Sequence, residues 1–264
     1  KRFGEEVRGF STERVAQHYG QWERGGITRG ALWRAGGAAG LLNCQLPEPY
    51  GLGGDFGHAA CVIEELARAN YLGIGFAIHS DMVAPYLMQY ASAPVRERWL
   101  PAMARGEAIG AIAMTEPGAG SDLKAIRTRA ERQGDHYLLN GQKTWITNGS
   151  NADVVVVVAT VAPELGARGL TLFCVDTALP GVTRGAPMAK IGQHAQDTSE
   201  VFFENVAVPV SHLPGDEQRG VDYLGEQLAA EPMAIALPSA ATDAGMLPES
   251  VAYLRPPKAV CRLP

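Results

Sequence analysis

The sequence contains few cysteines, and none of them lies at the spacing of a metal site or a redox pair. The four are scattered over 264 residues, at Cys44, Cys61, Cys174 and Cys261. This distribution excludes a Cys-x-x-Cys motif and does not make a disulfide framework in a chain of this size. We therefore expect a reducing compartment. The composition, rich in Ala, Gly and Arg, favours the cytoplasm of a bacterium, or the mitochondrial matrix if the source is eukaryotic.

Long apolar runs and clusters of positive charge are also absent. No run reaches the roughly 20 residues that a membrane-spanning helix needs. The net charge is −5, and without a basic stripe the surface does not favour nucleic acid. Because the chain begins with Lys rather than Met, we expect a trimmed start, with any targeting segment out of view.

The common catalytic templates are missing as well. There is no His-Glu-x-x-His and no Gly-x-Ser-x-Gly, "NGQKT" lacks the upstream glycine of a P-loop, and "YGLGGDFG" is not a dinucleotide fingerprint. The six histidines do not pair at metal-ligand spacing. We expect no metal site, and these absences disfavour a hydrolase, a kinase or a metalloprotease.

Residues 1–111 are predicted to form a helical domain. "GHAACVIEELARAN" (57–70) has apolar residues on one helical face and charges beside it. Residues 71–91 are apolar on most sides, which predicts a buried helix. Residues 93–107 predict a shorter helix that opens at Pro94.

Residues 112–213 are predicted to form a β-barrel-like domain of five to seven strands. The segments 153–160, 169–177 and 198–209 are rich in β-branched or aromatic residues and are bounded by turns. The order of helices, then strands, then helices indicates an α+β chain rather than a doubly wound nucleotide fold.

A hairpin is expected early in this β domain. In "HYLLNGQKTWIT" (136–147), the pair Asn140-Gly141 lies between two β-prone runs. Asn-Gly is the preferred two-residue turn of a hairpin, so the pattern predicts two strands that meet at this pair.

Residues 214–264 are predicted to form an incomplete helical domain that starts near Gly220. An interior proline costs a helix about 3 kcal/mol, so we expect either several short pieces or a departure from the helical pattern. The prolines that interrupt this region are Pro232, Pro238, Pro248, Pro256 and Pro257.

The stretch "AIAMTEPGAGSDLKAIRT" (111–128) is the most informative loop. Its glycines allow the backbone to approach a ligand closely, and Thr115 and Ser121 can donate and accept hydrogen bonds. Such a loop suits the polar edge of a planar heterocycle, although a plain connection into the strands has the same composition. Trp145 is open to the same two interpretations, as a core residue or as a face for stacking on a ring.

Three long segments together resemble the acyl-CoA dehydrogenase family. They are "MTEPGAGSDL", "YLLNGQKTWITNGSNAD" and "IGQHAQDTSEVFFENVAVP", with "EPYGLGGD" and "EELAR" upstream in the same order. The similarity runs from about Tyr19 to the end and is greatest to the long-chain branch. It implies a helical N-terminal domain, a middle β domain, a C-terminal four-helix domain, and FAD between the last two.

The resemblance implies two segments that contact the flavin and three residues near the acyl-CoA. The implied substrate residues are Ser121, Arg168 and Asp222. The implied FAD residues are Ile112, Ala113, Met114, Thr115, Gly120, Ser121, Trp145, Ile146 and Thr147.

The resemblance also implies a catalytic base at Glu231, because long-chain members carry a Glu-Arg pair there. This sequence departs from the pattern at several positions. Pro232 replaces the Arg, Asp222 stands where the long-chain pattern has Tyr, and in "LRPPKAVCRLP" Pro257 and Cys261 replace an Arg and a Gly of the family stretch.

Two functions follow from the resemblance. One is FAD-dependent α,β-dehydrogenation of a long-chain acyl-CoA, with an electron-transfer flavoprotein as partner and a homodimer or homotetramer as the assembly. The other is a truncated or impaired relative that binds flavin, acyl-CoA or a protein without turnover. An acyl-CoA oxidase on the same fold stays open.

Overall fold

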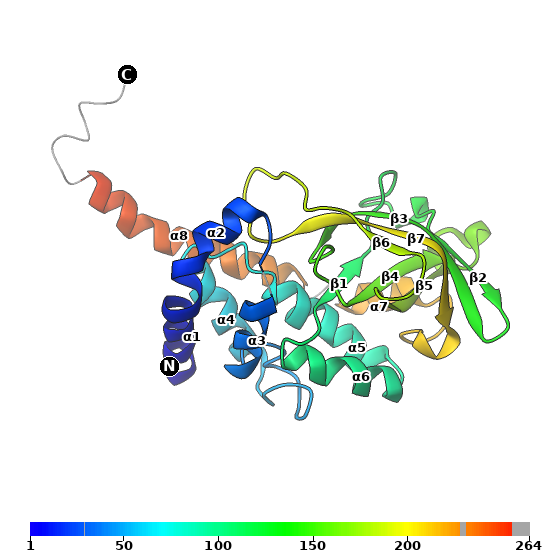
Figure 1. Ribbon diagram of the computed structural model, residues 1–264, viewed down its shortest axis with the longest axis horizontal. Coiled ribbons are helices and arrows are strands. Elements are labelled where there is room, and N and C mark those ends of the chain that lie inside the picture. The colour runs from blue at the N-terminus through cyan, green and yellow to red at the C-terminus, as the bar shows by residue number, and fades with distance from the viewer. Residues whose placement is uncertain (29, 228–230, 255–264) are drawn as a thin grey trace, which may run out of the picture.

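The computed structural model describes the chain except residues 29, 228–230 and 255–264, and it has a helical part beside a curled sheet (Figure 1). Within the described residues, no helix has the length and hydropathy to cross a membrane. The helical elements before the sheet are α1 (Arg2–Phe10), η1 (Ser11–Val15), α2 (Ala16–Gly25), α3 (Gly30–Ala38), α4 (Phe56–Arg68), η2 (Ile78–Val83), α5 (Ala84–Tyr90) and α6 (Ala93–Ala104).

The sheet has seven strands in the order β1-β4-β2-β3-β7-β6, with β5 paired to the other side of β4. The short β1 and the first residue of β2 pair in parallel with β4 along one side, whereas β2–β3, β3–β7, β4–β5 and β6–β7 are antiparallel. The strands are β1 (Gly110–Ala113), β2 (Arg129–Gln133), β3 (His136–Thr147), β4 (Val154–Thr160), β5 (Leu170–Asp176), β6 (Val182–Arg184) and β7 (Thr198–Pro209).

The valine run of β4 is buried on both faces, and this explains its composition. Val154, Val156 and Val158 pack in the cluster that the helices share with the sheet. Val155 and Val157 face the opposite way, into the interior of the curled sheet. Successive side chains of a strand point to opposite faces, so a strand covered on both sides needs apolar residues throughout.

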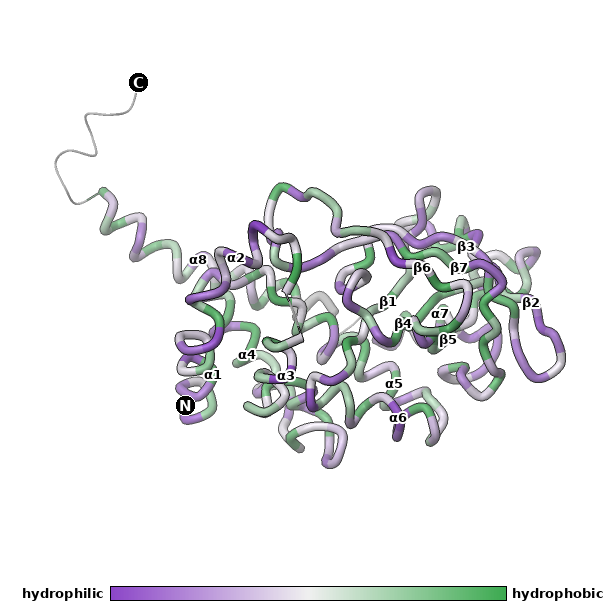
Figure 2. The backbone as a smooth tube through the Cα atoms, in the orientation of Figure 1, coloured by the Kyte–Doolittle hydropathy of each residue, from purple (hydrophilic) through white to green (hydrophobic). Residues whose placement is uncertain are grey.

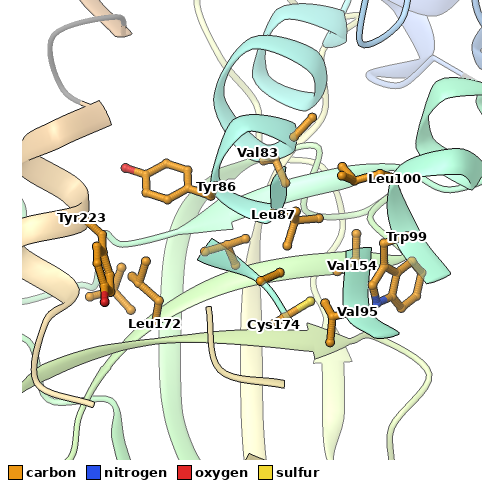
Figure 3. Close-up of a cluster of buried hydrophobic side chains, with 14 of the residues drawn as sticks. Val83, Tyr86, Leu87, Val95, Trp99, Leu100, Val154, Leu172, Cys174 and Tyr223 are labelled. Carbon is orange, nitrogen blue, oxygen red and sulfur yellow. The ribbon is translucent and has the colours of Figure 1, made fainter. Parts of the chain in front are cut away.

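The shared cluster joins the two halves of the molecule. Figure 3 shows Val83 and Leu87 beside Val154, with Trp99 and Leu100 on the adjoining helix. Tyr223 from the later helix α7 borders the same cluster. In Figure 2 the central strands are hydrophobic, whereas the hairpin that carries β2 projects as a hydrophilic arm.

The helix predicted over 57–70 is confirmed by α4, and the helix over 93–107 by α6. The helix predicted over 71–91 is correct only in its later part, because helical structure begins at Phe76. A Cβ at Gly75 would lie 2.0 Å from Oδ1 of Asn148. The end of β3 therefore packs directly on this backbone.

The prediction of a turn at Asn140-Gly141 is wrong. β3 is continuous through this pair, and the β2–β3 hairpin turns instead beside Gly134, whose φ is +65°. Asn140 accepts a hydrogen bond from the Asn205 backbone at 2.8 Å, at an irregularity in the β3–β7 pairing. A glycine is required at position 141 because the backbone there lies close to Thr128. A Cβ at this position would lie 2.3 Å from Oγ1 of Thr128.

The chain after the sheet forms two helices, α7 (Gly220–Gln227) and α8 (Glu231–Leu254). The expected break at the prolines does not occur within α8, although Pro238 and Pro248 lie inside it. The helix packs along α4, and a Cβ at Gly245 would lie 2.9 Å from the carbonyl oxygen of Arg68. Tertiary packing therefore outweighs the local preference. Pro256 and Pro257 lie outside the described residues.

A buried ion pair attaches the loop after β1 to β3. The Lys143 ammonium lies 2.8 Å from Oε1 of Glu116 and donates to the Met114 carbonyl at 2.9 Å. The Glu116 carboxylate also accepts from the backbone N–H groups of Arg127 and Thr128, at 2.7 and 3.0 Å. These four bonds hold both ends of the loop against the sheet.

Replacement of Gly141 by alanine tests the corrected register. We expect Gly141→Ala to lower the free energy of unfolding by about 1–3 kcal/mol, because the methyl group overpacks against Thr128. Gly225→Ala is the matched control, since a Cβ on this helical glycine has no neighbour within 4 Å. It should change stability by no more than ~1 kcal/mol, in the stabilising direction. Equal urea midpoints for the two variants would contradict the assignment.

Removal of one partner tests the ion pair. Lys143→Met leaves the buried Glu116 carboxylate without its cation and should cost about 3–5 kcal/mol of unfolding free energy. Adding Glu116→Gln should recover part of that loss. Arg129→Met is the control, because the Arg129–Glu131 pair has the same 2.8 Å separation but is exposed, so its loss should cost at most ~1 kcal/mol. Similar urea unfolding curves for Lys143→Met and the control would refute the role of burial.

Candidate functional site

The loop that follows β1 makes a tight turn with an open outer side. The backbone N–H of Glu116 donates to the carbonyl of Ala119 at 2.8 Å, and a reciprocal bond closes the turn. A Cβ on Gly118 or Gly120 would meet no atom within 4 Å. The outer side of the turn is therefore open to a ligand.

A β-bulge in β3 brings the second candidate stretch beside this loop. The pairing of β3 with β7 shifts register between Lys143 and Ile146. In the shifted segment the Thr144 N–H donates to the Thr115 carbonyl at 2.9 Å instead of to β7. Bulges re-aim side chains in this way. The two stretches that the sequence singles out, 115–121 and 145–147, therefore meet at one place.

Trp145 stands at the bulge in an unusual conformation. Its φ is +59°, and 59% of its surface is exposed. A positive φ is uncommon in a bulky residue and indicates a local constraint. The indole thus presents a large aromatic surface outward, which excludes the interpretation of Trp145 as a core residue.

The electrostatics of the site depend on the Lys143–Glu116 pair beneath it. Burial lowers the pKa of the Lys143 ammonium to about 8, and the bond to Glu116 opposes that change. Burial raises the pKa of the Glu116 carboxyl, but the hydrogen bonds from Lys143 and Thr128 outweigh it, so the pKa lies below its usual value. The pair is therefore ionised near pH 7, and the site above it is held by a fixed charge pair.

The polar groups at the surface of the site suit a planar ligand with a polar edge. Within the part of the chain that the structure describes, the hydroxyls of Thr115 and Ser121 have no hydrogen-bond partner in the protein. Together with the Trp145 face and the open backbone at Gly120, this donor set fits the isoalloxazine of a flavin. Thr147, Met114 and Ile112 are partly exposed at its margin.

Two of the predicted contact residues do not offer their side chains. Ala113 and Ile146 are buried in the interior cluster of the sheet. Any contact of these residues with a ligand at the surface of the loop would have to come from the backbone.

The residues expected near the acyl-CoA lie on neighbouring elements. Ser121 precedes the short 3₁₀ segment η3 (Leu123–Ala125), which packs against η4 (Pro163–Gly169), where Arg168 is exposed. The segment η4 also packs against α7, which carries Asp222. The Asp222 carboxylate accepts from Arg219 at 2.9 Å. Glu231 is the first residue of α8, and its side chain lies outside what the structure describes.

A cavity of about 460 Å³ lies between α4, η2 and α8, and no sequence pattern predicted it directly. Its volume is in the range of ligand pockets. One wall includes Val62, Ile63 and Leu66 from α4, and α8 closes the other side with Ile235 and Ser239 among others. Asp81, on η2, is a carboxyl beside the apolar part of the lining that α4 and residues 76–78 supply. The signal that could have found it is the charged residue inside the apolar run "FAIHSDMVAPYL".

Asn148 connects the cavity to the site where residues 115–121 and 145–147 meet. Its side-chain amide donates to the carbonyls of Gly75 and Gly110, at 3.1 and 3.2 Å. Gly75 precedes Phe76 in the cavity wall, and Asn148 follows Thr147 in the site. These bonds therefore help to set the distance between the two.

The other candidate groups are structural. His79 is fully buried, accepts from the Gly110 N–H and contacts the Met103 carbonyl, and burial lowers its pKa to about 4. It is a packing residue. Among the described residues no cluster of His, Cys, Asp and Glu could hold a metal ion.

Two family models match most of the chain. "Acyl-CoA dehydrogenase, N-terminal domain" matches residues 1–107, and "Acyl-CoA dehydrogenase, middle domain" matches residues 111–206. The mitochondrial long-chain specific acyl-CoA dehydrogenase of Sus scrofa is 44% identical over 260 residues, which are 97% of this chain and 60% of that relative. The chain thus spans about 60% of the length of this curated relative.

Solved structures agree with the sequence relatives. An acyl-CoA dehydrogenase from Geobacillus kaustophilus matches with a TM-score of 0.93 and 39% identity, over 96% of this chain and 68% of that one. An acyl-CoA dehydrogenase from Bacillus anthracis in complex with FAD matches with a TM-score of 0.85 and 28% identity, over 92% of this chain and 42% of that one. With this agreement in sequence and fold, the chain belongs to the acyl-CoA dehydrogenase family.

Proposed function

We propose that this chain takes part in the FAD-dependent α,β-dehydrogenation of a long-chain acyl-CoA. The observation that carries the proposal is the meeting of 115–121 with 145–147 at the Thr115–Thr144 hydrogen bond, beneath an exposed Trp145. The apolar cavity beside that site offers a place for an acyl chain. The names of the relatives supply the substrate class, and FAD is bound by the similar protein from Bacillus anthracis.

The residues present would contact one face and the polar edge of a flavin ring. Trp145 would cover a ring face, and Thr115, Ser121 and the adjoining backbone would bond to the polar edge. When bound, FAD would supply the acceptor for the hydride that leaves the β carbon. The buried ion pair and the Thr144–Thr115 backbone bond keep these groups in place before the ligand arrives.

Glu231 is the proposed base for the α proton. It is the first residue of α8, the helix whose Ile235 lines the cavity. Its carboxylate would take the α proton as the thioester carbonyl gains negative charge, which hydrogen-bond donors stabilise. Arg168, Asp222 and Ser121 are proposed to contact the CoA ester from the adjoining elements.

The proposed partners and location rest on the family alone. An electron-transfer flavoprotein would reoxidise the flavin, and a homodimer or homotetramer is the proposed assembly. A bacterial cytoplasmic location, or the mitochondrial matrix for a eukaryotic source, stays a prediction.

Binding without turnover is the second candidate function. Two observations favour it. Pro232 follows Glu231 where the family pattern has Arg, and Asp222 is already paired with Arg219.

Reconstitution with FAD tests the flavin site. The protein should retain the visible flavin bands after gel filtration. Trp145→Ala should weaken FAD binding about two- to tenfold, because a stacked aromatic pair is lost. Trp145→Phe keeps a ring and is the control, with a dissociation constant close to that of the parent. A colourless parent protein, or equal affinities in all three, would contradict the site.

Substitution of the base separates the two candidate functions. Glu231→Gln should abolish bleaching of the flavin by a long-chain acyl-CoA under anaerobic conditions while leaving FAD bound, because the amide cannot take the α proton. Unchanged bleaching would remove Glu231 from the mechanism. A parent protein that retains FAD and binds acyl-CoA but never bleaches would instead support binding without turnover.

A further inference from the structure

Asp81 is an unusual component of the cavity between α4, η2 and α8. The lining from α4 and from residues 76–78 is apolar, and among the described residues that line the cavity there is no Lys, Arg or His. The Asp81 carboxyl therefore faces the space without a cation. Its described hydrogen bond is from the Gln45 side-chain amide to Oδ1, at 3.1 Å.

The second carboxyl oxygen of Asp81 has acceptor capacity that no described residue uses. A carboxylate can accept about four hydrogen bonds, and one is made here. Asp81 keeps some accessible surface and is one of the residues that line the cavity. Burial alone raises the pKa of the carboxyl to about 7.

The backbone around Asp81 supports a role other than packing. Residues Ile78–Val83 form a π-helical stretch. Such stretches are rare and are frequently found at functional sites. Groups from the neighbouring elements do not neutralise the carboxyl. The nearby Cys44 thiol has its pKa raised by burial to about 12, and Asp243 on α8 is itself acidic.

We propose that Asp81 is a specificity-determining residue that selects acyl groups with a hydroxyl substituent in the portion that enters the cavity. The inference rests on the proposed function, because it assumes that the acyl chain occupies this space. An unsubstituted chain would remove water from the carboxyl and leave its free oxygen unpaired, which is unfavourable. A hydroxyl group at the matching carbon donates to that oxygen and restores the lost bond.

Calorimetric binding of acyl-CoA esters of one length tests the proposal without flavin turnover. The probes are dodecanoyl-CoA and its analogues hydroxylated at carbon 8, 10 or 12. The parent protein should bind at least one hydroxylated ester about tenfold more tightly than dodecanoyl-CoA, as expected for a hydrogen bond to a charged or partly charged group. The hydroxyl position that gives the greatest gain in affinity reports how far along the acyl chain Asp81 lies.

Variants then assign the preference to one side chain. Asp81→Leu, similar in size, should abolish or reverse the preference, and Asp81→Asn, which keeps an acceptor oxygen, should retain a weaker one. Asp243→Leu is the matched control. It also lines the cavity, but it is exposed at the α8 side, and the preference should persist in it. Circular dichroism of each variant checks that the helices are retained.

Three outcomes would overturn the inference. Equal affinities of the parent for all four esters would refute it and leave the proposed function intact. The same preference in Asp81→Leu as in the parent would move the selectivity to another residue. Binding of no ester by the parent would contradict the acyl-CoA function itself, and the inference would fall with it.

Discussion

The buried ion pair between Lys143 and Glu116 is the constraint on which the site depends. A buried charge without a partner is costly, so the two residues must meet whenever the sheet is folded. Because Lys143 belongs to β3 and Glu116 to the loop after β1, their meeting fixes the loop against the strand. The backbone bond from Thr144 to Thr115 then follows at the next residues. The geometry of the surface above the pair is therefore set by the need to pair these two buried charges.

The sheet can supply such a site because it is rigid on both faces. The valines of β4 fill the space under the helices on one side and the interior of the curled sheet on the other. A layer packed this densely on both sides is hard to compress. The strands can therefore hold a strained position such as Trp145, whose positive φ would relax in a looser setting. The densely packed core thus supports the strained backbone at Trp145.

Local patterns in the sequence predicted the elements that depend on local chemistry. The apolar face of α4 follows from periodicity, and the valine run from burial of a strand. The Asn140-Gly141 turn was wrong because the dipeptide signal is local, whereas the role of Gly141 is set by Thr128, which belongs to a neighbouring segment. The continuity of α8 through Pro238 likewise depends on its packing against α4. The resemblance pointed to both site segments, but the bulge that joins them arises from strand pairing that no short motif encodes.

The cavity could not be predicted from local sequence patterns either, because it depends on contacts between separate elements. Asn148 nevertheless links it directly to the site. A cavity is a property of several elements together, and the sequence pattern of each one alone does not reveal it. Asn148, which follows the site on β3, bonds to the carbonyl of Gly75 at the cavity wall and to that of Gly110 at the start of β1. Its backbone N–H also donates to the Asp197 carbonyl, and Gln196 beside it lines the cavity. A ligand that spans both places must therefore match a separation that these bonds help to set. The chemical selectivity for such a ligand would then depend on the groups at its two ends, which are Trp145 at the site and Asp81 in the cavity.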